Sequence, residues 1–197
     1  MMQRPTLLLA SQSPRRLELL GMLGFDVLVQ PADVDESCVT ADTPAALTER
    51  LARLKAEAIA STATPDHPPI IAADTLVELN GEILGKPKDE ADAKRMLSSL
   101  SGQTHAVHTG LAVVYRGKTV SIVETATVRF RPLNDDEIRS YVDSGVPMDK
   151  AGAYGIQGPA GAFVERIEGD YFTIVGLPLC RIVSLLRNEF GFPISDQ

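Results

Sequence analysis

The stretch TLLLASQSPRRLELLGML, residues 6–23, places a short apolar run, a polar turn and an amphipathic segment in succession. The run 6–10 predicts a strand, while Ser13, Pro14 and Gly24 suit the cap, the first position and the end of a helix. A strand that passes through a polar turn into a helix is typical of α/β proteins. We therefore expect an α/β fold that begins with this unit.

A second helix is predicted from the cap residue Thr43 and from Pro44, which suits a first helical position. Apolar residues then recur at helical spacing, and we expect this stripe to be buried: Leu47, Leu51, Leu54 and Ala58. Residues 70–79 predict a strand that turns at Asn80-Gly81, the strongest two-residue hairpin signal, and returns through 82–84.

The remaining segments continue this mixture of helices and strands. Asp89 caps a helix that runs to Leu100, and Asn134 begins another. The other expected elements are strands at 103–115 and 120–130 around an Arg116-Gly117 turn, a glycine-rich loop at 150–161, short strands at 162–167 and 171–175, and a helix from Pro178 to about Phe190. We expect a mixed sheet with helices, in one domain spanning residues 1–197.

Composition excludes several classes of protein. The chain has 197 residues, of which 44% are hydrophobic and 23% are charged, so a folded core is expected. Its formal net charge of −7 argues against a general nucleic-acid binder. No apolar run is long enough to cross a bilayer, and Cys38 and Cys180 are expected to be reduced thiols, so we expect a cytoplasmic protein.

Two stretches contain residues suited to phosphate chemistry. Residues 11–16, Ser-Gln-Ser-Pro-Arg-Arg, lead into a helix N-terminus, which with two guanidinium groups makes an anion site; a capped helix with solvated arginines is an equal alternative. Asp74 interrupts an apolar strand, where an unpaired carboxylate is expensive to bury. Asp74 is therefore a candidate general base or metal ligand, with a locally satisfied Asp as the alternative.

Other charged residues are individually weaker candidates. Asp33, Asp35 and Glu36 occupy one loop and offer a second carboxylate for Mg²⁺, although a solvated acidic loop explains them as well. Lys55, Lys86 and Lys150 are singly unremarkable, and the three histidines are too scattered for a metal cluster. The chain contains neither a Walker A motif nor a GxGxxG fingerprint, so phosphate binding has to use Arg, Lys and a metal.

Five blocks together resemble the Maf family of nucleotide pyrophosphatases in order and spacing along essentially the whole chain. They are ASQSPRR (10–16), ADT (73–75), GKP (85–87), LSG (100–102) and KAGAYGIQG (150–158). The resemblance implies an elongated α/β fold related to the inosine triphosphate pyrophosphatase group, with a cleft between two lobes, and commonly a homodimer. Gln12 departs from relatives that have Gly there, a change that costs stability if the position needs a positive φ.

The same resemblance assigns roles to individual residues. Asp74 stands at the position of the family's catalytic carboxylate, which acts as the proton acceptor. Residues at the phosphate and metal end of the site are Ser11, Arg15, Arg16, Glu36, Lys55 and Lys86, with Glu36 and Asp74 on a Mg²⁺ or Mn²⁺ ion. Substrate specificity is associated with Arg15, Thr75 and Gln157.

Within the family, residues 150–158 look like the branch that hydrolyses dTTP and UTP to the monophosphate and pyrophosphate. The Gln157 amide offers a donor and an acceptor, which suits the imide edge of uracil or thymine. Three alternatives stay open: hydrolysis of 7-methyl-GTP, hydrolysis of modified pyrimidine nucleotides as a house-cleaning reaction, and a non-catalytic nucleotide- or nucleic-acid-binding regulator of cell division.

Overall fold

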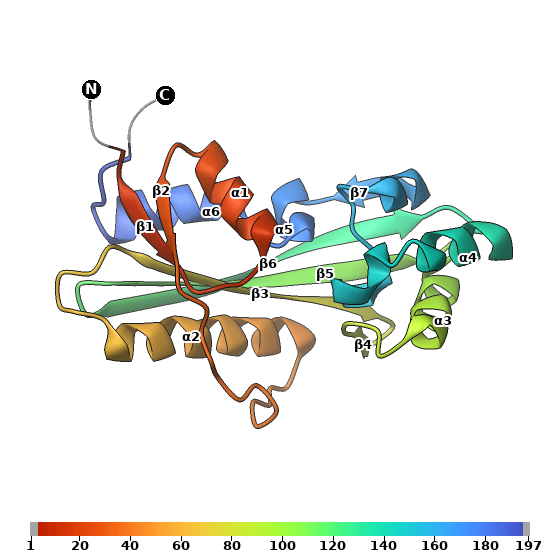
Figure 1. Ribbon diagram of the computed structural model, residues 1–197, viewed down its shortest axis with the longest axis horizontal. Coiled ribbons are helices and arrows are strands. Elements are labelled where there is room, and N and C mark those ends of the chain that lie inside the picture. The colour runs from red at the N-terminus through yellow and green to blue at the C-terminus, as the bar shows by residue number, and fades with distance from the viewer. Residues whose placement is uncertain (1–3, 195–197) are drawn as a thin grey trace. The chain divides into compact units, whose positions relative to one another are not determined.

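A computed structural model describes residues 4–194 and has the expected mixed α/β architecture (Figure 1). Its strands are β1 (Thr6–Leu9), β2 (Asp26–Val29), β3 (Ile70–Leu79), β4 (Glu82–Leu84), β5 (Thr104–Tyr115), β6 (Lys118–Phe130) and β7 (Val164–Glu168). Its α-helices are α1 (Pro14–Met22), α2 (Pro44–Thr62), α3 (Glu90–Leu100), α4 (Asp135–Asp143), α5 (Tyr171–Val175) and α6 (Leu179–Ser184). Short 3-10 turns lie at Val146–Asp149 (η1), Ala151–Ala153 (η2) and Pro159–Phe163 (η3), and a π-helical turn, Leu185–Glu189 (η4), continues α6.

The strands form one seven-stranded sheet in the order β2-β1-β3-β5-β6-β7, with β4 paired to β3. β1 is parallel to both β2 and β3, with Leu8 opposite Ile70, whereas β4 and β7 are antiparallel to β3 and β6. At the β3–β4 turn, Asn80 and Gly81 have φ values of 52° and 86°, which is the left-handed backbone that this hairpin needs. The mixed sheet with hairpins is therefore confirmed.

The chain divides into two compact units. The first contains the chain up to Asp74, residues 109–124 and the chain from Gly176 onward, and the second contains residues 75–108 and 125–175. The division matches the expectation of two lobes, while the cleft and the single domain over residues 1–197 stay predictions.

The first unit is built around the tight packing of α2 on the sheet. The buried core includes Ala52 and Ala56 of α2 against Leu8 and Ala72. α2 covers one face of the sheet in this unit, and α1 and α6 lie on the other face (Figure 1).

The predicted α2 stripe was partly wrong, because Leu47 and Leu54 are only half-buried. The buried face instead carries the smaller side chains of Thr48, Ala52 and Ala56. At its N-terminal end α2 lies so close to β5 that a Cβ on Gly110 would be 2.1 Å from the carbonyl oxygen of Thr48. Small residues therefore face the sheet, since large ones would hold the helix away from it.

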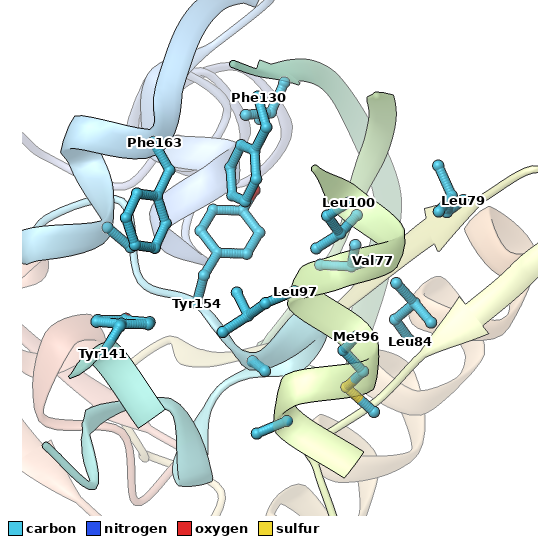
Figure 2. Packing of buried hydrophobic residues seen from close by; sticks show 14 of the residues in the cluster. Val77, Leu79, Leu84, Met96, Leu97, Leu100, Phe130, Tyr141, Tyr154 and Phe163 are labelled. Carbon is cyan, nitrogen blue, oxygen red and sulfur yellow. The ribbon is translucent and has the colours of Figure 1, made fainter. Parts of the chain in front are cut away.

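The second unit has an aromatic and aliphatic core under α3 and α4. Phe130, Tyr154, Phe163 and Tyr141 pack around Leu97 (Figure 2). Phe130 and Tyr154 meet edge to face, with ring centroids 4.8 Å apart.

The strand predicted at 171–175 was wrong, because these residues form helix α5. The Asp170 carboxylate accepts hydrogen bonds from the backbone N–H of Thr173 at 2.8 Å and from its hydroxyl at 2.9 Å. A carboxylate that satisfies N–H groups at the start of a turn favours a helix over a strand. The apolar residues Tyr171 to Val175 gave no periodicity that distinguishes the two.

The structure also bears on the backbone at Gln12 and on the length and hydropathy of the helices. Positive φ values at non-glycine positions in residues 4–194 occur at Asn80, Arg116 and Ala153, so Gln12 does not occupy a glycine-type conformation. No helix within the described part of the chain combines the length and hydropathy needed to span a membrane.

Candidate active site

Asp74 lies in β3 on the face that packs against α2. Ile70 and Ala72, at alternate positions before it, belong to the core with Ala56, so the period of two in a strand directs Asp74 to the same face. The Lys55 ammonium of α2 donates to Asp74 Oδ1 at 2.6 Å, and both side chains are only 14% exposed. The carboxylate that sequence singled out is therefore paired with a cation, as a half-buried charge requires.

Glu36 reaches the same lysine from the loop after β2. Its Oε1 lies 3.0 Å from Lys55 Nζ, so one ammonium contacts two carboxylates from separate segments. Asp35 is accounted for locally, because its Oδ1 accepts from the backbone N–H of Ser37 at 2.9 Å and from its hydroxyl at 2.6 Å, which lowers the pKa of Asp35. The structure thus distinguishes Glu36 from Asp35, which the sequence alone did not.

Arg16, in the first turn of α1, is held by two acceptors. Its Nε donates to the Gly176 carbonyl at 2.9 Å, and its Nη1 donates to Ser11 Oγ at 3.2 Å. Ser11 Oγ also accepts the backbone N–H of Ser13 at 3.2 Å. The polar turn before α1 therefore orients a guanidinium group at the positive end of a helix, an arrangement that suits an anion.

The charges near Arg16 show which predicted residues surround it. Burial lowers the pKa of Arg16, and the adjacent Arg15 lowers it further, whereas the carboxylates of Asp74 and Glu36 raise it. Arg16 therefore interacts electrostatically with Arg15, Asp74 and Glu36. Ser11 and Lys55 also belong to the first unit, so of the residues expected at the phosphate and metal end only Lys86 lies in the second unit.

The donor set of Glu36 and Asp74 fits a divalent cation. Both carboxylates already converge on one positive charge, the Lys55 ammonium, and hard oxygen ligands are those that Mg²⁺ prefers. Magnesium sites in proteins often use only one or two carboxylates and complete their coordination with substrate phosphates and water. Among the described residues, no group of three or more His, Cys, Asp and Glu side chains is arranged for a metal.

The second unit contains the remaining predicted residues: Thr75, Lys86 and Gln157. Lys86 and Gln157 are exposed, and Thr75 is partly buried. The segments of Lys86 and Gln157 are joined by a backbone hydrogen bond of 3.0 Å from the N–H of Gly152 to the carbonyl of Gly85.

The other residues considered in the sequence have structural partners. Lys150 Nζ donates to the Val146 carbonyl at 2.6 Å, which closes the turn before the glycine-rich loop. His105 contacts the Tyr154 hydroxyl at 2.8 Å, and His108 bridges Glu78 and Thr125 at 2.9 Å each. These contacts give His105 and His108 structural roles.

Sequence reasoning missed the Gly176 carbonyl, which anchors Arg16. A backbone acceptor carries no residue-type signal, and Gly176 is far from Arg16 along the chain. The one indirect sign in the sequence was the glycine before Leu177-Pro178. Gly176 adopts a φ of 115°, which other residues rarely reach.

Comparison with known proteins identifies the family of this chain. A family model described as "Maf-like protein" matches residues 6–189, and the chain belongs to the Maf family. The resemblance stated from the five sequence blocks is thereby confirmed.

Its relatives are similar over nearly their whole length. A dTTP/UTP pyrophosphatase of Symbiobacterium thermophilum is 50% identical over 188 residues, with 95% of each chain covered. Another from Geobacter sulfurreducens is 50% identical over 189 residues, covering 94% of this chain and 97% of that one. A Staphylococcus aureus Ham1 protein structure matches with a TM-score of 0.47 and 20% identity, covering 64% of this chain and 71% of that one, a likeness too weak to support an inference.

Proposed function

We propose that this protein is a nucleoside triphosphate pyrophosphatase that hydrolyses dTTP and UTP to the monophosphate and pyrophosphate. The observation that carries the proposal is the convergence of Asp74, Lys55, Glu36 and Arg16 in a chain that is 46–50% identical to dTTP/UTP pyrophosphatases. A carboxylate held among cations is suited to hydrolysis of an anionic substrate, because it can accept a proton while the cations balance the phosphate charge.

In this reaction Asp74 accepts a proton from water as the water oxygen bonds to the α-phosphorus. The bond from that phosphorus to the α,β-bridging oxygen breaks, and pyrophosphate leaves. Lys55, Arg15, Arg16 and Lys86 neutralise the charge that develops on the leaving group. Ser11 contributes by orienting the Arg16 guanidinium group.

We assign a divalent cation, Mg²⁺ or Mn²⁺, to Glu36 and Asp74. When bound, such an ion neutralises charge on the phosphate oxygens. Lys55, which contacts both carboxylates here, has a flexible stem that can direct its ammonium to a phosphate instead.

Recognition of the pyrimidine is assigned to Gln157, with Thr75 and Arg15. The exposed Gln157 amide has both a donor and an acceptor for the imide edge of uracil or thymine. The proposal includes a cytoplasmic location, consistent with the free, exposed thiols Cys38 and Cys180. It also includes a homodimer and no nucleic-acid partner, in keeping with a net charge of −7.

Product analysis with Mg²⁺ tests the proposal. UTP and dTTP should give monophosphate and pyrophosphate, and turnover of CTP, ATP and 7-methyl-GTP should be slower. In ¹⁸O-labelled water the label should enter the monophosphate, because the water oxygen bonds to the α-phosphorus. Label in pyrophosphate would contradict the assigned position of attack, and preference for 7-methyl-GTP would contradict the assigned base.

The Asp74→Asn variant should lose at least about a hundredfold in kcat, since a general base contributes on that order. Asp66→Asn is the matched control, because Asp66 is an exposed aspartate to which we assign no role. Equal activity of the two variants would remove Asp74 from the mechanism. Absence of turnover of every nucleotide by the unmodified protein would instead favour a binding or regulatory role.

A further inference from the structure

Gly152 lies where three segments of the second unit meet. It belongs to η2 in the glycine-rich loop that leads to Gln157, and it is buried. Its backbone N–H donates to the carbonyl of Gly85, the residue immediately before Lys86, at 3.0 Å. On another side it faces Val77, which lies on β3 two residues after Thr75.

The contact with Val77 leaves no room for a side chain. A Cβ on Gly152 would lie 3.0 Å from Val77 Cγ2 and 3.1 Å from both Cβ and Cγ1. Val77 is 2% exposed and packs in the core of the second unit beside Leu84 and Leu100 (Figure 2), so it cannot easily move aside. Gly152 also has a φ of 66°, in the left-handed region that favours glycine.

Several contacts hold the loop between Gly152 and Gln157. The Lys150 stem fills the space beside Gly155, where a Cβ would lie 2.7 Å from Lys150 Cε. Gly155 N–H donates to the Tyr141 hydroxyl at 3.3 Å, and its carbonyl accepts Gly158 N–H at 3.1 Å, which closes the turn that contains Gln157. These contacts link the position of Gly152 to that of the turn that contains Gln157.

We propose that Gly152 is a positioning residue of the substrate site: because it lacks a side chain, the Gln157 loop seats against Val77 and Gly85 at once. This contact fixes the base-recognising amide of Gln157 relative to the Lys86 ammonium and Thr75. The inference rests on the proposed function, because those three residues are assigned through it. It adds a residue that touches no substrate and acts through its neighbours.

The experiment compares Gly152→Ala with Gly117→Ala in steady-state hydrolysis of UTP, dTTP and CTP. Gly117 is a matched control: its φ is 75°, but a Cβ there meets nothing within 4 Å. Both variants take on left-handed strain, and only Gly152→Ala also pushes against Val77. Gly152→Ala should raise KM for UTP about tenfold and lower kcat by a smaller factor. It should also reduce the preference for UTP over CTP. Small displacements of binding groups have effects of at least this order.

A second substitution tests whether the contact with Val77 is the cause. Val77→Ala in the Gly152→Ala background removes Cγ1 and Cγ2, two of the three Val77 atoms that crowd the added methyl group. KM and base preference should therefore move part of the way toward those of Val77→Ala alone. If Gly152→Ala does not fold, this comparison of the double variant with Val77→Ala decides the question. A KM of the double variant that still exceeds that of Val77→Ala by the full tenfold would overturn the steric link.

Different experimental results would overturn the role of Gly152 and the proposed function. A Gly152→Ala protein with the KM and base preference of Gly117→Ala, while unmodified protein hydrolyses UTP, would overturn the inference alone. An unmodified protein that hydrolyses no nucleotide would overturn the proposed function and the inference with it.

Discussion

At the level of single residues, the proposed metal site predicts that Lys55 and a divalent cation compete for the same carboxylate oxygens. Its ammonium lies 2.6 Å from Asp74 Oδ1 and 3.0 Å from Glu36 Oε1, the two carboxylates assigned to the metal. Replacing it by Met removes the competing charge and keeps the length of the side chain. We expect Lys55→Met to bind Mn²⁺ about tenfold more tightly without nucleotide, since a unit charge near a protein surface changes binding by a few kcal/mol at most.

Electron paramagnetic resonance of free Mn²⁺ during a titration measures this affinity without relying on turnover. Lys118→Met is the control, because Lys118 also pairs with a carboxylate, Glu189, at 2.8 Å, but at an exposed site with no assigned metal. Its Mn²⁺ affinity should equal that of the unmodified protein. Unchanged or weaker binding by Lys55→Met would show that the ammonium does not compete with the metal.

At the scale of elements, the predictable features were those with a strong local cause. Asn134 was expected to begin a helix, and its side chain does accept the Glu137 N–H at 2.9 Å while the Glu137 carboxylate accepts the Asn134 N–H at 3.0 Å. The turn at Asn80-Gly81 was likewise local. Helix α5 and the buried face of α2 were mispredicted because an Asp170 side chain and the close approach of Gly110 decide them.

In the candidate site, too, local features could be predicted and contacts between distant segments could not. Motif residues such as Asp74 and Lys55 could be nominated from sequence, and their contact could not, because Lys55 approaches from a different element. The Gly176 carbonyl and the Gly85–Gly152 hydrogen bond are backbone groups, so residue type gives no direct sign of them.

The capping box of α4 provides a test at this scale. Asn134→Ala should lower the free energy of unfolding by about 1 kcal/mol, because the Glu137 N–H at the start of α4 loses its acceptor. Asn134→Ser should lower the free energy of unfolding by less than Asn134→Ala does, since a serine hydroxyl can also accept a hydrogen bond from the N–H at the helix start. Urea unfolding at constant pH measures both, and an equal loss for Ala and Ser would mean that the cap hydrogen bond does not stabilise α4.

For the whole molecule, acid stability depends on a histidine in the core of the second unit. His105 is 2% exposed, its Nε2 contacts the Tyr154 hydroxyl at 2.8 Å, and its Nδ1 is buried without a hydrogen-bond partner. Burial lowers the pKa of His105 from 6.5 to about 4. The folded protein therefore keeps this imidazole neutral at a pH where the unfolded chain protonates it.

The sign of the effect follows from proton uptake. Between pH 6.5 and about 4 the unfolded chain binds more protons at His105 than the folded one, so acidification favours unfolding. Stability from this group is fully present above pH 6.5 and is lost progressively as the pH falls. From pH 7.5 to pH 5 the loss amounts to about 2 kcal/mol.

His105→Gln isolates this contribution, because Gln keeps a polar group for the Tyr154 hydroxyl and does not titrate in this range. The variant has a lower stability at pH 7.5, because it loses the edge-to-face contacts of the imidazole with Phe130 and Tyr154. Its free energy of unfolding, measured in urea at pH 7.5 and pH 5, should nevertheless fall by about 2 kcal/mol less than that of the unmodified protein. All other ionisable groups are the same in both proteins, so their effects cancel in this comparison. Parallel losses would mean that the folded protein accommodates a charged His105.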